Sequence, residues 1–175
     1  MNRILTGLGP AATFLVFFAA IHSSDAIGQQ TEATRLAGAW SLVSWYNVSD
    51  DGKAMPQPVD GTDPRGILIF DSHGHFSLVI ATDRPKWKSP DRMEGTDEEN
   101  KLAARGALAY FGTYSVNDND RTFTLNVERG LHPNLNGTTQ RRSFTLIGDE
   151  LKYSTPPFRY PKGTFTGYFV WKRVP

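Results

Sequence analysis

Residues 38–48 have the sequence GAWSLVSWYNV, and this stretch decides the fold. It is rich in the β-branched and aromatic residues that favour strands. Alternate side chains of a strand point to opposite faces, so one face carries Trp40, Leu42, Ser44 and Tyr46 and the other Ala39, Ser41, Val43, Trp45 and Asn47. Because both faces hold bulky side chains, this strand needs cover on both sides.

The last stretch of the chain has the same character. Residues 164–174 read TFTGYFVWKRV, again rich in aromatic and β-branched residues. Pairing this strand with the one at 38–48 closes a sheet and removes both of its exposed edges. The two stretches together predict a β-barrel.

Specific motifs at both ends resemble a known family. Gly38-x-Trp40 and Trp171-Lys172-Arg173 look like the opening and closing signatures of lipocalin-type barrels, in which a cation packs over a buried tryptophan. Between them, in order, stand DPRGILIF at 63–70, GHFS at 74–77, DRP at 83–85, AYFGTY at 109–114, PNxxGTxQxR at 133–142 and GDxL at 148–151.

These motifs resemble the bacterial and fungal lipocalin-like domain family from Leu36 to Val174. The resemblance implies an all-β, eight-stranded antiparallel up-and-down barrel, with Gly38, Trp40 and Arg173 as its structural signature. Most characterised lipocalins bind small hydrophobic molecules, so the resemblance also implies a ligand. It bears on the fold more directly than on the function.

Residues 1–26 have the features of a secretory signal peptide. A basic Arg3 precedes an apolar run, and Ser24-Asp25-Ala26 forms a small-x-small cleavage site. The alternative is an uncleaved membrane anchor, but Pro10 and two nearby glycines interrupt the run of about 20 apolar residues that a spanning helix needs. We expect a secreted or periplasmic protein with no stable membrane span after cleavage.

The length of the chain after residue 26 predicts a single domain. Residues 27–36 are expected to be a flexible lead-in with one helical turn, and residues 37–175 the barrel. A domain of about 150 residues buries roughly 70% of its unfolded surface, so it needs no disulfide, and the chain has no cysteine. The full sequence has 19 Lys and Arg residues against 18 Asp and Glu residues and no basic stripe, which argues against nucleic acid as a partner.

Turn signals divide the middle of the chain into six more strands and one helix. The strands are expected at 65–71, 74–82, 110–117, 121–129, 138–147 and 150–154. The capping-box sequence Thr96-Asp97-Glu98-Glu99 predicts a short helix to about Leu108, between the third and fourth strands. The proline-rich segment 55–64 is either a lid over the barrel mouth or an irregular surface loop.

Arg142 is the leading candidate for a polar contact inside the barrel. We favour an inward face formed by Gln140, Arg142, Phe144 and Leu146 over the alternate set on the same strand. An interior guanidinium binds a carboxylate or another anion with two parallel hydrogen bonds. The alternatives are an outward arginine or an internal pair with Glu128.

The histidines have several interpretations. His73 and His75 form a His-x-His pair, but no third ligand stands at a recognisable spacing, so we predict no metal and no cofactor. His75 begins a strand and is predicted to project into the barrel mouth. His132 lies in a loop, where exposure is the commoner state. If the protein is an enzyme, its acid and base candidates are His75, His132, Glu128 and Tyr110.

Aromatic side chains are expected to line the barrel or to fill it. They are Tyr46, Phe76, Tyr110, Tyr114, Phe123, Phe144, Tyr153, Phe165 and Tyr168. The predicted ligand-binding set consists of Arg142, His75, Tyr46, Phe76, Tyr114, Phe144 and Tyr168. An ordinary packed core has the same composition.

The sequence therefore favours an exported protein that binds a small hydrophobic or amphipathic molecule in the barrel. One alternative is an isomerase or cyclase that uses the same pocket, and another is a structural module with a filled barrel. The binding protein is favoured over the enzyme, and the sequence makes no prediction of ligand identity or oligomeric state.

Overall fold

The computed structural model describes residues 31–56, 59–160 and 163–175. Its elements in chain order are α1 (Glu32–Leu36), β1 (Gly38–Ser49), β2 (Ala54–Pro56), β3 (Thr62–Phe70), β4 (His75–Asp83), α2 (Asp97–Arg105), β5 (Ala107–Asn117), β6 (Thr122–Gly130), η1 (Pro133–Leu135), β7 (Thr139–Ile147), β8 (Glu150–Ser154), β9 (Phe158–Tyr160) and β10 (Gly163–Arg173). The segment predicted as a signal peptide lies outside the described residues.

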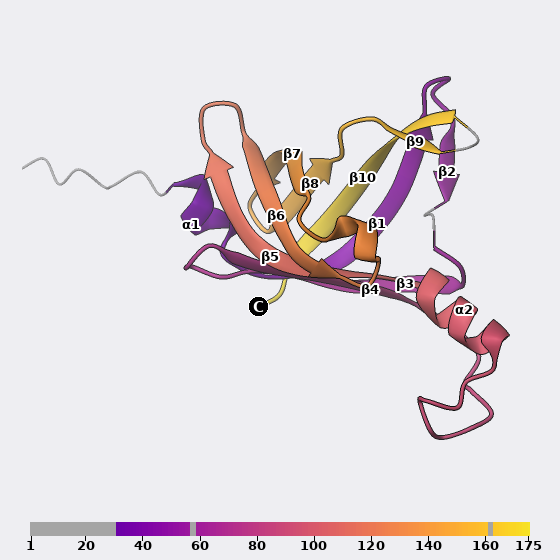
Figure 1. Cartoon of the computed structure of the whole chain (residues 1–175). Coiled ribbons are helices and arrows are strands. Elements are labelled where there is room, and N and C mark those ends of the chain that lie inside the picture. The colour runs from indigo at the N-terminus through magenta and orange to yellow at the C-terminus, as the bar shows by residue number, and fades with distance from the viewer. Residues whose placement is uncertain (1–30, 57–58, 161–162) are drawn as a thin grey trace, which may run out of the picture.

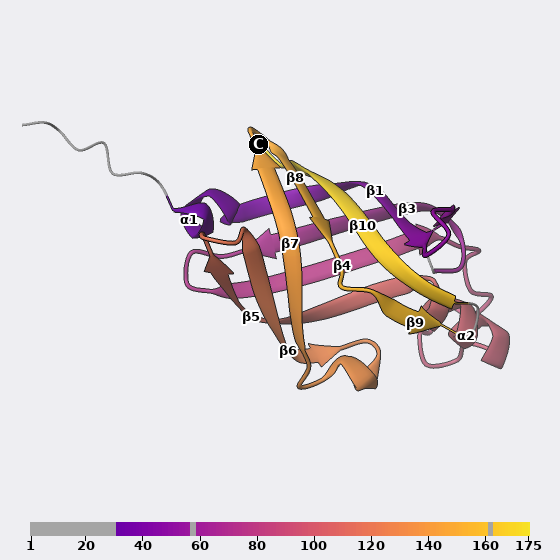
Figure 2. The ribbon, with the colours of Figure 1, turned by 90° about the horizontal axis from the view of Figure 1, so that it is seen from above.

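Eight antiparallel strands close into a barrel in the order β1, β3, β4, β5, β6, β7, β8, β10 (Figures 1 and 2). The closing pair runs from Trp40 opposite Arg173 to Ser49 opposite Phe165. The predicted pairing of the first and last strands is thereby confirmed. Two short strands add to the sheet beside the closing pair: β2 pairs with the end of β1, and β9 pairs with the start of β10.

The predicted position of the helix needs a correction. Helix α2 follows the fourth strand of the chain, because the three-residue strand β2 lies where a loop was expected. Pro56 ends β2, and a proline is tolerated in such an edge strand. Thr96 caps α2 through the predicted capping box with Glu99, but the helix ends at Arg105, because β5 begins at Ala107.

The barrel is closed at the end near α1. Leu36 of α1 is fully buried, and its carbonyl accepts a hydrogen bond from Trp40 Nε1 at 2.9 Å. The Arg173 guanidinium lies 4.1 Å from the centre of the Trp40 ring and donates to the carbonyl oxygens of Ala37 and Arg35. Residues 32–36 of the expected lead-in therefore form a docked helix.

Aromatic rings fill the half of the barrel next to this closed end. Phe123 lies 5.4 Å from Phe70 and 5.3 Å from Tyr153, both in edge-to-face contact. Phe70 also contacts Tyr114 at 4.7 Å. Burying each large apolar side chain of this kind contributes roughly 1.5–3 kcal/mol. This half is a packed core, and α2 lies at the opposite end of the barrel (Figures 1 and 2).

Candidate functional site

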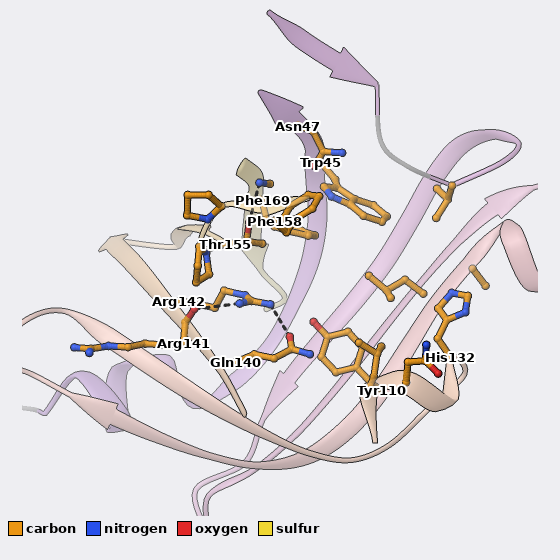
Figure 3. Close-up of a pocket in the computed structure, with 18 of the residues that line it drawn as sticks. Trp45, Asn47, Tyr110, His132, Gln140, Arg141, Arg142, Thr155, Phe158 and Phe169 are labelled. Atoms are coloured by element: carbon orange, nitrogen blue, oxygen red, sulfur yellow. Dashed lines mark hydrogen bonds between the residues drawn. The ribbon is translucent and has the colours of Figure 1, made fainter. Parts of the chain in front are cut away.

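A pocket of about 890 Å³ opens at the α2 end of the barrel (Figure 3). Its walls come from β1, β5, β7 and β10, and its rim comes from α2, η1 and the loop after β8. The lining residues are Trp45, Asn47, Val59, Arg105, Ala107, Leu108, Tyr110, His132, Pro133, Asn134, Leu135, Thr139, Gln140, Arg141, Arg142, Thr155, Pro156, Pro157, Phe158, Gly167 and Phe169.

Stacked aromatic rings form one part of the inner wall of the pocket. Trp45 of β1 and Phe169 of β10 stack with ring centres 5.2 Å apart. Phe169 stacks in turn on Tyr153, at 4.7 Å, and Tyr153 belongs to the packed half of the barrel. This column of rings joins the pocket to the core and gives the pocket an apolar aromatic wall.

Arg142 lies on β7 and reaches the pocket on the same face as Gln140. Its Nη2 donates to Gln140 Oε1 at 2.5 Å, and its Nη1 donates to the Arg141 carbonyl at 3.1 Å (Figure 3). Its Nε is buried and has no hydrogen-bond partner. No carboxylate within 4.0 Å neutralises this guanidinium in the part of the chain that the structure describes.

Two tyrosine hydroxyls lie near Arg142. Burial raises the pKa of Tyr110 above 10, although the adjacent Arg142 guanidinium opposes the shift. Burial raises the pKa of Tyr153 further, with a smaller contribution from the Tyr110 hydroxyl. Both phenols are therefore neutral hydrogen-bond donors at physiological pH. Figure 3 shows the Tyr110 hydroxyl turned toward Gln140 and Arg142.

The rim of the pocket is basic, but its charges are paired. Arg105 at the end of α2 forms an ion pair with Asp60 at 2.9 Å. Arg141 forms another with Asp120. Among the described lining residues there are three arginines and His132, and none is acidic. Because the rim arginines have acidic partners, the charge that favours a ligand with negative charge or with hydrogen-bond acceptors is that of Arg142.

The segment that we considered as a lid lies partly at this rim. Val59 lines the pocket, and the Asp60 carbonyl accepts a hydrogen bond from Thr82 Oγ1 at 2.5 Å. The Asp60 amide donates to the Arg105 carbonyl at 3.0 Å. This part of the loop is thus attached to the end of α2.

The structure brings three of the predicted site residues together. Arg142, Tyr110 and His132 all line the pocket, although His132 is an exposed residue at the start of η1. Glu128 lies on the exposed face of β6 and forms no ion pair with Arg142. The four acid and base candidates do not converge on one place.

His75 points away from the barrel mouth, so the prediction of its orientation was wrong. Phe76 and Leu78 take the inward positions of β4, which turns the alternate residues outward. The His75 side chain is 64% exposed, and its Nδ1 lies 3.0 Å from Asp71 Oδ2. Across the described residues, no group of three potential metal ligands gathers.

Tyr46 and Tyr168 also lie on the outer surface, where they stack 5.4 Å apart. The register of β1 shifts between Leu42 and Ser44, and this bulge reverses the face on which later residues lie. Trp45 therefore replaces Tyr46 as the inward aromatic residue. On β10, Trp171 and Phe169 are buried, so Tyr168 points outward.

The other predicted contact residues belong to the packed half. Phe76, Tyr114 and Phe144 are buried and do not line the pocket. The prediction missed Trp45 and Phe169. For Phe169 a signal existed, because counting back two positions from the inward Trp171 gives its face.

An antiparallel barrel that is closed at one end and holds a pocket at the other defines a class of small β-barrels suited to one small ligand. The model of the lipocalin-like domain family matches residues 37–174, and the chain belongs to this family.

A curated relative and a solved structure are also similar to this chain. The relative is the 4'-hydroxy-3'-methoxypropiophenone carrier protein ppsC of Aspergillus oryzae (strain ATCC 42149 / RIB 40). It is 32% identical over 104 residues, which cover 55% of this chain and 94% of the relative. The structure of a redesigned β-barrel superimposes with a TM-score of 0.41 at 14% identity, over 84% of this chain and 98% of that chain.

Proposed function

We propose that this protein binds a small, largely apolar molecule in the pocket at the α2 end and acts as a carrier for it. The observation that carries the proposal is the pocket itself. Its volume of about 890 Å³ falls within the range of roughly 300–1,000 Å³ that is usual for small-molecule sites. Aromatic walls with a few convergent polar groups are also the usual composition of such sites.

The similarity to a named carrier protein supports this proposal. The Aspergillus relative carries, by its name, an aromatic ketone with a phenolic hydroxyl group. A molecule of that kind has a flat apolar body and a polar end. The Trp45–Phe169 pair offers contact to the body, and Arg142 offers contact to the polar end. Burial of the body contributes about 25 cal/mol per Å² before the costs of association are subtracted.

A neutral fluorescent dye tests binding. We expect N-phenyl-1-naphthylamine to gain fluorescence with the purified protein and to be displaced by 4'-hydroxy-3'-methoxypropiophenone. Leu108→Trp places a large ring in the pocket and should abolish the signal. Ile147→Trp is the matched control, because Ile147 is 76% exposed and does not line the pocket. Equal dye binding by the two variants, or no binding by the unaltered chain, would reject the proposal.

We also propose that the protein is exported. The support is the basic Arg3, the apolar run and the Ser24-Asp25-Ala26 site, and none of these residues is among those that the structure describes. The part of the chain that is described contains no helix long and apolar enough to cross a membrane. Expression of the full chain should yield a mature form that begins at Ile27, as read by amino-terminal sequencing. A product that keeps residues 1–26 would contradict export with cleavage.

A further inference from the structure

We propose that the pocket selects aromatic molecules with one acidic group that is ionised at neutral pH, and that Arg142 binds this group. This inference rests on the proposed function, and it adds the chemical class and the orientation of the ligand. The acidic head lies against β7 and the aromatic body lies against Trp45 and Phe169.

The first argument is the unbalanced charge of Arg142. The pocket has three arginines, and Arg105 and Arg141 each have an aspartate partner. Arg142 bonds only to neutral acceptors, and its buried Nε has no partner. Arg142 is half-buried at the pocket wall, and its buried Nε is unsatisfied, so a group that pairs with this guanidinium gains charge-assisted hydrogen bonds. An anionic ligand supplies that group.

The second argument is the geometry of the donors around Arg142. Its two hydrogen bonds, to Gln140 and to the Arg141 carbonyl, fix the plane of the guanidinium. Each terminal nitrogen carries a second N–H group that these bonds do not use. The neutral Tyr110 hydroxyl is a further donor at the same place. Parallel N–H groups with an adjacent O–H group match the oxygens of a carboxylate or sulfonate.

The third argument is the aromatic wall formed by β1 and β10. Trp45 and Phe169 stack with an interplanar angle of 19°, so they present nearly parallel rings. Figure 3 shows these rings and the Arg142 side chain entering the pocket from different walls. A planar aromatic body can contact the rings while its head reaches the guanidinium. A neutral ligand leaves the Arg142 charge unbalanced, and a cationic ligand meets repulsion from it.

Two dyes with a shared body test the role of charge. Both 8-anilinonaphthalene-1-sulfonate and the neutral N-phenyl-1-naphthylamine contain a naphthalene ring and a phenylamino group, and only the first carries a sulfonate. The measured quantity is the neutral dye's Kd divided by the sulfonate dye's Kd, at about 0.15 M salt to screen distant charges. In Arg142→Met we expect this ratio to fall by about tenfold or more, with the Kd of the neutral dye changed less than about twofold.

The matched control is Arg129→Met. Arg129 is exposed, does not line the pocket and donates to the Glu128 carbonyl, so its loss lowers the net charge by the same amount. We expect an unchanged ratio in this variant. If neither dye binds the unaltered chain, the proposed function itself fails. If both dyes bind and Arg142→Met leaves the ratio unchanged, the binding proposal stands and the selection by charge is overturned.

A competition on the unaltered chain needs no variant and covers the case in which Arg142→Met does not fold. We expect 2-naphthoate to displace the neutral dye at a concentration at least about tenfold lower than 2-naphthamide, which has the same ring and no charge. The advantage should disappear when the pH falls below the pKa of the naphthoate carboxyl group, at about 4. Equal displacement at neutral pH would overturn the inference.

Discussion

Val43 decides which aromatic side chains of β1 reach the pocket. The register with β10 shifts between Leu42 and Ser44, so Trp40 and Trp45 both point inward although they are an odd number of residues apart. Neither a glycine nor a proline marks this bulge in the sequence. Strict alternation therefore predicted Tyr46 instead of Trp45. A single irregular residue limited the prediction of the candidate site.

Gly38 is expected to be intolerant of any side chain. Its φ is +131°, which L-residues rarely adopt, and a Cβ there would lie 2.8 Å from Arg173 Nη1. Gly38→Ala should lower the free energy of unfolding by about 2–3 kcal/mol, because backbone strain adds to the displacement of Arg173 from Trp40. Urea denaturation measures this loss.

Gly52 supplies the control for that measurement. It also has a positive φ, of +81°, but a Cβ there would meet nothing within 4 Å. Gly52→Ala should therefore cost only about 1 kcal/mol. Equal losses in the two variants would show that the contact with Arg173 contributes nothing.

Asp71 makes the contribution of the β3–β4 turn to stability depend on pH. The backbone N–H of His75 lowers the pKa of Asp71 from 3.8 to about 2, with further contributions from the His75 ring and the His73 amide. A carboxyl group with a lowered pKa stabilises the fold fully above its unfolded value and loses this effect as the pH falls through its folded value. The contribution should therefore disappear between about pH 4 and pH 2.

Asp71→Asn tests this dependence. The variant should be less stable than the unaltered chain at pH 7, and the difference should shrink as the pH falls from about 4 to about 2. Thermal unfolding followed by circular dichroism at each pH gives the comparison. Parallel pH profiles for the two proteins would contradict the role of Asp71.

At the scale of elements, helix α1 is part of the barrel's closed end. Leu36 is fully buried, so Leu36→Ala should lower the free energy of unfolding by about 2–4 kcal/mol through the cavity that it leaves. Leu131→Ala makes the same chemical change at a residue that is 46% exposed, and we expect a loss below about 0.5 kcal/mol. A small loss in both variants would mean that α1 unfolds separately from the barrel.

The main strands were predictable because strong turn signals separate them. Gly148-Asp149 joins β7 to β8, and the run of Asn and Asp residues at 117–120 joins β5 to β6, both as expected. The short strands β2 and β9 were not predicted, because each has three residues and lies in a proline-containing segment. Both short strands form because they pair with a neighbouring long strand, β2 with β1 and β9 with β10. The residues of the short strands alone do not indicate such pairing.

For the whole molecule, the sequence left a filled barrel and a hollow one as alternatives, and the structure contains both. Phe70, Phe123 and Tyr153 fill the half near α1, whereas the half near α2 keeps its pocket. Alternation predicted that Arg142 shares a face with Gln140, and both line the pocket. Residues of η1 and of the loop after β8 form part of the pocket rim. Their place there depends on how segments distant in the sequence pack together, so no local sequence pattern indicated it.

The ladder between β1 and β10 sets the order of events when the chain is made. These partners come from opposite ends of the domain, so their pairing waits until β10 has left the ribosome. Until then one edge of β1 has unpaired backbone groups and is open to chaperones or to aggregation. The cylinder therefore cannot close around its pocket before β10 has been synthesised.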